Sequence, residues 1–238
     1  MIQVQTYLGE IEAAMQENRK LLAVLIDPDK FDERNTSEFL RKLPNTTSHI
    51  FVGGSSVAPN RTDEVVAELK KETGLPVILF PGDQHQITDK ADALLFLSLI
   101  SGRNPEFLIE QQVRSVEKIR NTSLEVIPTG YILIDGGKET SVQRVSQTRP
   151  LPQTNISQIV NTALAGQYSG KRLIYLEAGS GANHSVSCEI IREVKKAISI
   201  PLIVGGGIKS SKQLKKAYEA GASLVVVGTA FEEDSFQN

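Results

Sequence analysis

Short, continuous apolar runs recur along the chain and alternate with amphipathic stretches. The first six runs cover residues 22–26, 49–52, 77–80, 93–97, 126–134 and 173–176, and two more lie within 201–208 and 220–230. Most of them end in glycine, proline or a polar residue. Runs of this length and composition are typical of parallel strands buried on both faces.

The stretches between these runs carry apolar residues at helical spacing. They predict helices over residues 11–19, 37–43, 62–71, 105–120, 156–168, 185–197 and 210–219. About eight strands that alternate with helices predict a (β/α)8 TIM barrel. Since no linker or shift in composition divides the chain, we expect residues 1–238 to form a single domain.

The third strand-to-strand connection is unusually short. Residues 80–93 have little apolar face and are close to the minimum length for a parallel crossover. A reduced or missing third outer helix would leave a groove lined by apolar strand residues, where an elongated apolar ligand could lie. A short helix that closes the ring is an equally good interpretation of the pattern.

The connection after the fifth run is unusually long. Residues 135–154 are polar, rich in Gly, Pro, Ser and Thr, and only weakly periodic. Loops of about twenty residues in compact domains are usually lids, binding loops or disordered segments. Its position on the catalytic face of a barrel favours a lid.

Composition narrows the class of protein. The chain has 26 basic and 28 acidic residues, and no dense basic stripe indicates nucleic-acid binding. The single cysteine, Cys188, excludes an internal disulfide framework. No apolar run approaches the length of a membrane span, and residues 1–10 lack a signal-peptide pattern. We therefore expect a soluble cytoplasmic protein, which can still contact a membrane peripherally.

The last two runs end in glycine turns that suit a phosphate. Gly206 and Gly207 follow the seventh strand, and Gly228 and Thr229 follow the eighth. Glycine lets an anion approach backbone N–H groups closely, and the loops after strands seven and eight form the usual phosphate site of such barrels.

Asp27 and Ser55 follow the first two strands. Asp27 precedes Pro28, and this pair is typical of a helix N-cap, which competes with any chemical role. A carboxylate beside a hydroxyl is also a common way to hold Mg²⁺, with substrate phosphates as further ligands. Both interpretations stay open on this evidence.

Tyr175 and Glu177 end the sixth strand on one face, opposite Ile174 and Leu176. A charge at this position costs free energy unless it is paired or faces the barrel mouth. We favour a general base, Glu177, assisted by a hydrogen bond from Tyr175. The alternative is a salt bridge to a neighbouring basic residue.

Five segments together resemble one family. They are LIDPDK at 25–30, VGGS at 52–55, YLEAGSG at 175–181, VGGGIK at 204–209 and VGT at 227–229. This set, in this order over the whole chain, is similar to the geranylgeranylglyceryl phosphate synthase family, which includes the bacterial heptaprenylglyceryl phosphate synthases. Leu25 replaces the lysine of the shorter bacterial members, so that lysine's contact cannot be carried over. Together with the form of the 175–181 segment, this indicates the longer branch typified by archaeal enzymes.

The resemblance implies a prenyltransferase. Such an enzyme moves a polyprenyl group, here geranylgeranyl, from its diphosphate to the terminal hydroxyl of sn-glycerol 1-phosphate, with Mg²⁺ and release of diphosphate, to form an ether-lipid precursor. It implies that Asp27 and Ser55 hold the metal, and that family members self-associate. The residues implied to bind glycerol phosphate are Tyr175, Leu176, Glu177, Ala178, Gly179, Ser180, Gly181, Gly206, Gly207, Gly228 and Thr229. Alternatives are another phosphate-binding barrel, such as a flavin-dependent oxidoreductase or a sugar-phosphate isomerase, or a barrel that binds a phosphorylated ligand without turnover.

Overall fold

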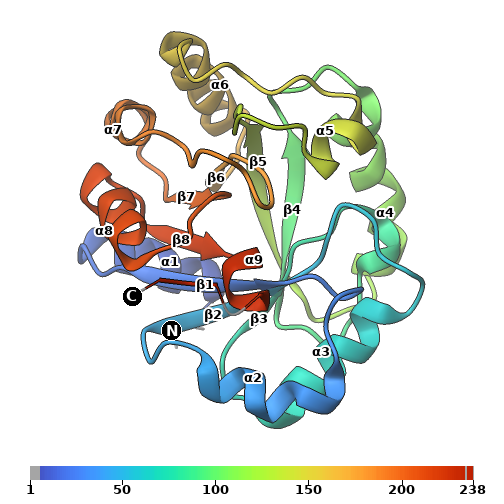
Figure 1. Ribbon diagram of the computed structural model, residues 1–238. Helices are drawn as coiled ribbons and strands as arrows, with labels where there is room; N and C mark the ends of the chain where they lie inside the picture. The colour runs from blue at the N-terminus through green and yellow to red at the C-terminus, as the bar shows by residue number, and fades with distance from the viewer. Residues whose placement is uncertain (1–5, 234, 238) are drawn as a thin grey trace, which may run out of the picture.

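The computed structural model describes residues 6–233 and 235–237, in which eight parallel strands close into a barrel in chain order (Figure 1). The predicted barrel is confirmed. The first five residues of the N-terminal segment considered above lie outside the described residues. The strands are β1 (Leu21–Ile26), β2 (Thr47–Val52), β3 (Val77–Leu79), β4 (Ala93–Leu99), β5 (Glu125–Leu133), β6 (Leu173–Glu177), β7 (Leu202–Gly205) and β8 (Leu224–Val227).

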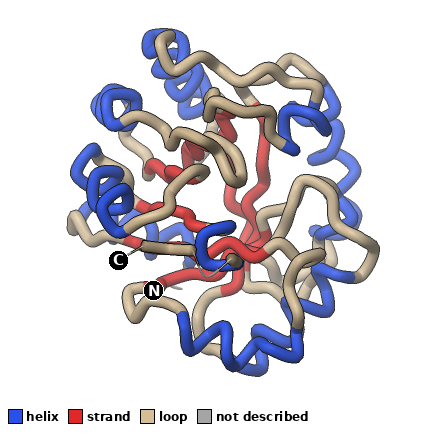
Figure 2. Tube along the Cα trace, viewed as in Figure 1, coloured by secondary structure: helices blue, strands red, loops and turns tan. Residues whose placement is uncertain are grey.

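Helices surround the strands as an outer ring (Figure 2). The α-helices are α1 (Tyr7–Gln16), α2 (Thr36–Lys42), α3 (Arg61–Glu72), α4 (Gln111–Ile119), α5 (Ser141–Ser146), α6 (Ile156–Tyr168), α7 (Cys188–Ala197), α8 (Ser211–Ala220) and α9 (Thr229–Glu232). The short elements η1 (Glu33–Asn35), η2 (Gln84–Gln86) and η3 (Glu106–Glu110) complete the set. Among the described residues, no helix is long and apolar enough to span a membrane.

Two helices begin elsewhere than the sequence pattern predicts, and capping explains both. α1 begins at Tyr7, because Thr6 accepts the N–H of Gly9 and the carboxylate of Glu125 accepts the N–H groups of Tyr7 and Leu8. α7 begins at Cys188, because the side chain of Ser187 accepts the N–H of Ile190. Side-chain caps of this kind satisfy the free N–H groups of a first turn.

The third outer helix is reduced to the single 3-10 turn η2, and β3 before it is only three residues long. The predicted reduction is therefore confirmed. η2 still has a structural role, because the amide of its buried Gln86 donates to Gly54 O at 2.8 Å and accepts the Gly54 N–H at 3.1 Å. The turn after β2 is held in place by this pair of hydrogen bonds.

The long connection after β5 is more ordered than its polar sequence indicates. It contains α5, capped by the buried Thr140, and Leu151 forms a bridge beside Ile134 at its far end. The structure therefore places a helix and a short pairing where the sequence predicted a loop.

Alternation along the strands divides the core into two layers. Phe51, Tyr131 and Tyr175 belong to the cluster inside the barrel, whereas Ile174 and Leu176 belong to the cluster between strands and helices. The rings of Tyr131 and Tyr175 lie 5.4 Å apart between centroids. The inner side chains thus form a packed floor beneath the mouth.

Candidate active site

Glu177 is the central acid of the mouth, at the end of β6. Its side chain is buried, and Oε1 accepts the N–H of Gly179 at 2.6 Å. Burial raises the pKa of Glu177 to about 7, partly offset by the Gly179 N–H and by the hydroxyl of Tyr175. Among the described residues Glu177 forms no ion pair. The salt-bridge alternative is therefore wrong, and the group has the pKa that a general base needs near neutrality.

Tyr175 lies next to Glu177 on the inner face of β6, as the alternation predicted. Its hydroxyl is buried without a hydrogen-bond partner in the described part of the protein. The hydroxyl and Glu177 Oε2 both lie against Gly205, since a methyl group added to Gly205 would overlap the hydroxyl and lie 2.7 Å from Oε2. The hydroxyl is near enough to Glu177 to lower the pKa of its carboxyl, and the hydrogen bond between the two side chains stays a prediction.

Glycines bring the loops after β6 and β7 into contact. Gly206 and Gly207 have φ values of +81° and +70°, which favour glycine. A methyl group on Gly206 would lie 2.5 Å from the backbone N of Gly179, and one on Gly207 would lie 3.0 Å from the N of Ser185. The close approach of these two loops requires glycine at both positions.

The glycine turns present free backbone donors. In the described part of the chain, the N–H groups of Gly206, Gly207, Gly228 and Thr229 donate no hydrogen bond. The loops after β6 and β8 are linked, because the hydroxyls of Ser180 and Thr229 lie 2.8 Å apart. Unpaired N–H groups and hydroxyls at adjacent strand ends are suited to bind an anion.

Two residues of the 175–181 segment contribute to the core of the protein and offer no polar side-chain group to a ligand. The side chain of Leu176 packs in the outer core, away from the mouth. Ala178 is fully buried, and its N–H already donates to Gly205 O at 3.1 Å. The N–H of Gly179 is likewise taken by Glu177. Within this segment, the backbone donors left for a ligand belong to Ser180 and Gly181, beside the free hydroxyl of Tyr175.

Asp27 and the Gly54–Ser55 turn meet on the opposite side of the mouth. A methyl group on Gly54 would lie 3.3 Å from Asp27 Oδ1, so the carboxylate faces the turn after β2. The Asp27 carboxylate is partly exposed and pairs with Lys30 at 3.1 Å. These are hard oxygen donors at the mouth, with a carboxylate that already attracts a cation, which fits Mg²⁺.

The helix-cap interpretation of Asp27 is wrong. Residues 28–30 form a turn, and the next helical element, η1, is capped by Asp32. Asp27 Oδ1 instead accepts the N–H of Asp29 at 3.2 Å. The turn leaves the other oxygen, Oδ2, facing Lys30.

Glu232 of α9 completes this cluster, and sequence reasoning missed it. Its Oε1 accepts the N–H of Asp27 at 2.9 Å, and Oε2 lies 3.9 Å from Lys30 Nζ. Burial raises the pKa of Glu232, opposed by the Asp27 N–H and by Lys30. Asp27 and Glu232 are 205 positions apart, so no local signal could have found the pair. Among the described residues, no group of three or more His, Cys, Asp or Glu side chains is placed to hold a metal ion.

A cavity lined mainly by apolar side chains lies between Ser55 and β4. It lies in the sector where the third helix is reduced and, together with the open solvent at its mouth, contains about 800 Å³ of empty space. Tyr131 lines its inner end, Leu97 and Phe107 line its length, and Val145 of α5 covers it. The predicted apolar groove is thus present, and the 135–154 segment covers part of it.

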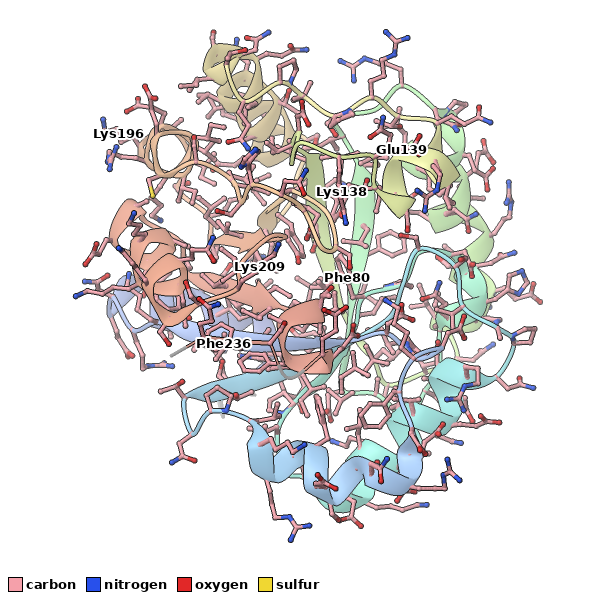
Figure 3. All side chains as sticks on the ribbon, in the orientation of Figure 1. Phe80, Lys138, Glu139, Lys196, Lys209 and Phe236 are labelled. Atoms are coloured by element: carbon pink, nitrogen blue, oxygen red, sulfur yellow. The ribbon has the colours of Figure 1, made fainter. Side chains whose placement is uncertain are left out.

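The same segment also reaches the loop after β6. Asn183 donates to Gly137 O at 2.9 Å, and the N–H of His184 donates to Gly136 O at 3.0 Å. These bonds hold Lys138 with its Nζ near Gly181 (Figure 3). Lys138 was not singled out from the sequence, because its contact depends on how two separate loops pack.

The fold and this mouth define a (β/α)8-barrel enzyme. The chain belongs to the PcrB family, whose model matches residues 14–238. A protein of Zunongwangia profunda named geranylgeranylglyceryl phosphate synthase is 58% identical over 230 residues, which cover 97% of this chain and 98% of that protein. A protein of Pyrococcus furiosus with the same name is 41% identical over 230 residues, covering 94% and 91%. The resemblance found in the sequence is confirmed, and the chain is a prenyltransferase-type enzyme.

Comparison with solved structures supports the same family. The (S)-3-O-geranylgeranylglyceryl phosphate synthase of Thermoplasma acidophilum, in complex with its substrate sn-glycerol-1-phosphate, superposes with a TM-score of 0.89 at 34% identity, covering 96% of this chain and 92% of that one. A thiamine phosphate pyrophosphorylase of Pyrococcus furiosus, at 14% identity and a TM-score of 0.56, shares the fold alone.

Proposed function

We propose that this enzyme transfers a polyprenyl group, geranylgeranyl or one of similar length, from its diphosphate to the terminal hydroxyl of sn-glycerol 1-phosphate. The observation that carries the proposal is the position of Glu177. This buried carboxylate, with a pKa of about 7, lies at the same mouth as the free N–H groups of the glycine turns, and the neighbouring strand β5 supplies Tyr131 to the lining of the apolar cavity. The names of the relatives support the same reaction.

The acceptor would lie on the loops after β6, β7 and β8. The free N–H groups of Gly206, Gly207, Gly228 and Thr229 would bind its phosphate. The glycerol would then extend toward Glu177. The N–H of Gly179 donates to Oε1 of this carboxylate and leaves Oε2 for the acceptor. Binding the phosphate at a fixed point places the reacting hydroxyl in the geometry that the transfer needs.

The donor would lie across the mouth, with its tail in the cavity. Asp27 and Ser55 would hold Mg²⁺, which fits their oxygen donors, and Lys30 adds a positive charge nearby. When bound, Mg²⁺ supplies stabilisation of the charge that develops on the departing diphosphate. The walls of the cavity exclude water from the tail, and Glu177 accepts the proton of the attacking hydroxyl.

The experiment that tests the proposal is product analysis. The purified protein is incubated with Mg²⁺, labelled sn-glycerol 1-phosphate and prenyl diphosphates of increasing chain length, and label that becomes lipid-soluble is measured. We expect transfer that depends on all three components. Absence of lipid-soluble label with every donor would refute the proposal, and a coloured protein with bound flavin would favour the oxidoreductase alternative. Self-association and cytoplasmic location stay predictions.

Replacement of Asp27 by asparagine should raise the Mg²⁺ concentration needed for half-maximal activity by about tenfold or more, because the amide removes the charge that attracts the cation. Calorimetric binding of Mg²⁺ together with inorganic diphosphate should weaken in parallel. Lys70→Gln, which removes a charge from α3 where Lys70 pairs with Asp92 just before β4, serves as the control. An unchanged Mg²⁺ requirement would remove Asp27 from the metal site.

The pH dependence of kcat/KM should show an acidic limb near pH 7. Glu177 must be ionised to accept a proton, and its pKa is raised to about 7 rather than lowered. Activity should therefore fall as the pH drops below 7, more than two pH units above where an ordinary glutamate would titrate. The residual activity of Glu177→Gln is the control for titration of the substrate phosphate. A limb that persists in this variant would belong to another group.

A further inference from the structure

Lys138 lies at the edge of the glycine loops without a charged partner. A methyl group on Gly181 would lie 3.0 Å from Lys138 Nζ, so the amine rests on the loop after β6. Among the described residues no carboxylate lies within ion-pair distance of Lys138, and the neighbouring Glu139 pairs instead with Arg144 at 3.5 Å. The positive charge at this point is unneutralised.

The loop that carries Lys138 is fixed in place. Gly137 has a φ of +81°, and its N–H donates to Asp135 Oδ1 at 2.9 Å. Its carbonyl accepts from Asn183, and the carbonyl of Gly136 accepts from the N–H of His184. A methyl group on Gly136 would lie 2.7 Å from Cβ of Ala182, so the two loops are in direct contact. The backbone position of Lys138 therefore follows from the packing of two loops, and its exposed side chain reaches Gly181 from there.

Strand order decides which substrate this amine faces. In a closed barrel of eight strands, the loop after β5 is next to the loop after β6 and opposite the loop after β1. Lys138 is thus next to the loop of Ser180 after β6, whose hydroxyl lies 2.8 Å from that of Thr229, and its own loop is opposite the loop of Asp27. In Figure 3, Lys138 lies toward the centre of the molecule, whereas Lys196 lies at its outer edge.

We propose that Lys138 is a specificity-determining residue that recognises the phosphate of the acceptor. This rests on the proposed function. The free N–H groups of the glycine turns bind the phosphate oxygens but carry no net charge, and a phosphate monoester carries close to two negative charges at neutral pH. Lys138 supplies a full positive charge on an adjacent loop, so that a phosphorylated acceptor is favoured over an uncharged one.

The test is direct binding of sn-glycerol 1-phosphate, measured by calorimetry with the full chain. Lys138→Gln should raise the Kd by about tenfold, and Lys138→Arg should keep most of the affinity. Binding should also become less sensitive to salt in Lys138→Gln. Inorganic phosphate, used as a second probe, should also bind Lys138→Gln more weakly than it binds the wild type. In the steady state, the KM for the acceptor should rise while kcat and the KM for the prenyl diphosphate stay unchanged.

Lys196→Gln is the matched control, because it removes the same charge from α7, where Lys196 pairs with Glu193. An unchanged Kd in Lys138→Gln would overturn the inference, and so would an equal loss in Lys196→Gln, which would show a general effect of net charge. Wild-type protein that binds no sn-glycerol 1-phosphate would overturn the proposed function itself. Binding by the wild type with no change in Lys138→Gln overturns the role of Lys138 alone.

Discussion

Glutamine in place of Glu177 should lower turnover by about 10²- to 10⁴-fold while the protein keeps its fold and still binds sn-glycerol 1-phosphate. The amide has almost the same shape, and its oxygen can still accept the N–H of Gly179, which the carboxylate accepts at 2.6 Å. It cannot take up the proton of the acceptor hydroxyl. Steady-state kinetics with labelled acceptor measure the loss, and calorimetry measures the binding that should remain. Unchanged turnover would remove Glu177 from the mechanism.

Thermal unfolding of the same variant tests why Glu177 has its raised pKa. The folded pKa is about 7 and the ordinary pKa of a glutamate is 4.5, so the folded state favours the protonated acid. Its contribution to stability is fully present below pH 4.5 and is lost as the pH rises through 7, by about 3 kcal/mol in total. Glutamine does not titrate. The variant should therefore match the wild type in acid and exceed it at pH 8; equal stability at pH 8 would contradict a buried charge.

Alanine in place of Gly206 should abolish most acceptor binding and destabilise the fold by about 2 kcal/mol or more. Gly206 has a φ of +81°, and the added methyl group would overlap Glu177 Oε1 and lie 2.5 Å from the N of Gly179. The methyl group would displace the base and the loop that presents Ser180. Thermal unfolding and calorimetric binding of sn-glycerol 1-phosphate give the two readouts.

Two other glycines separate strain from crowding in this experiment. Gly170 has a φ of +89° with nothing within 4 Å of an added methyl group, so Gly170→Ala should cost about 1 kcal/mol and leave binding intact. Gly74 has open space and no positive φ, so Gly74→Ala should change stability by less than about 0.5 kcal/mol. If Gly206→Ala binds the acceptor as well as Gly170→Ala does, crowding at the mouth is not what matters.

The barrel was predictable because strands buried on both faces read as continuous apolar runs. The inward direction of Tyr175 and Glu177 followed from the two-residue period of a strand, and η2 followed from a connection too short and too polar for a full helix. Chain order then placed the glycine turns at one end. These features depend on local composition and spacing.

Other features depend on contacts that local sequence does not encode. An Asp-Pro pair occurs both at the N-cap of helices and in isolated turns. Only the structure shows that Asp27 belongs to a turn. α5 is polar enough to look like a loop, yet Val142 and Val145 line the cavity. Glu232 and Lys138 reach the mouth through the packing of distant segments. Closure of the barrel, which fixes these neighbours, is a property of the whole chain.

The position of the cavity beside η2 separates the part of the enzyme that carries the reaction chemistry from the part that would accept the tail. The groups proposed to handle charge follow β1, β2, β6, β7 and β8, whereas the walls of the cavity come mainly from β4, residues 80–87, α4 and α5. Exchange of one wall residue for a larger or smaller apolar one can alter the space for a tail without touching a carboxylate or a phosphate loop. Reaction chemistry and tail length can therefore be selected independently, which would let related chains diverge in the lipids they make while keeping one mechanism.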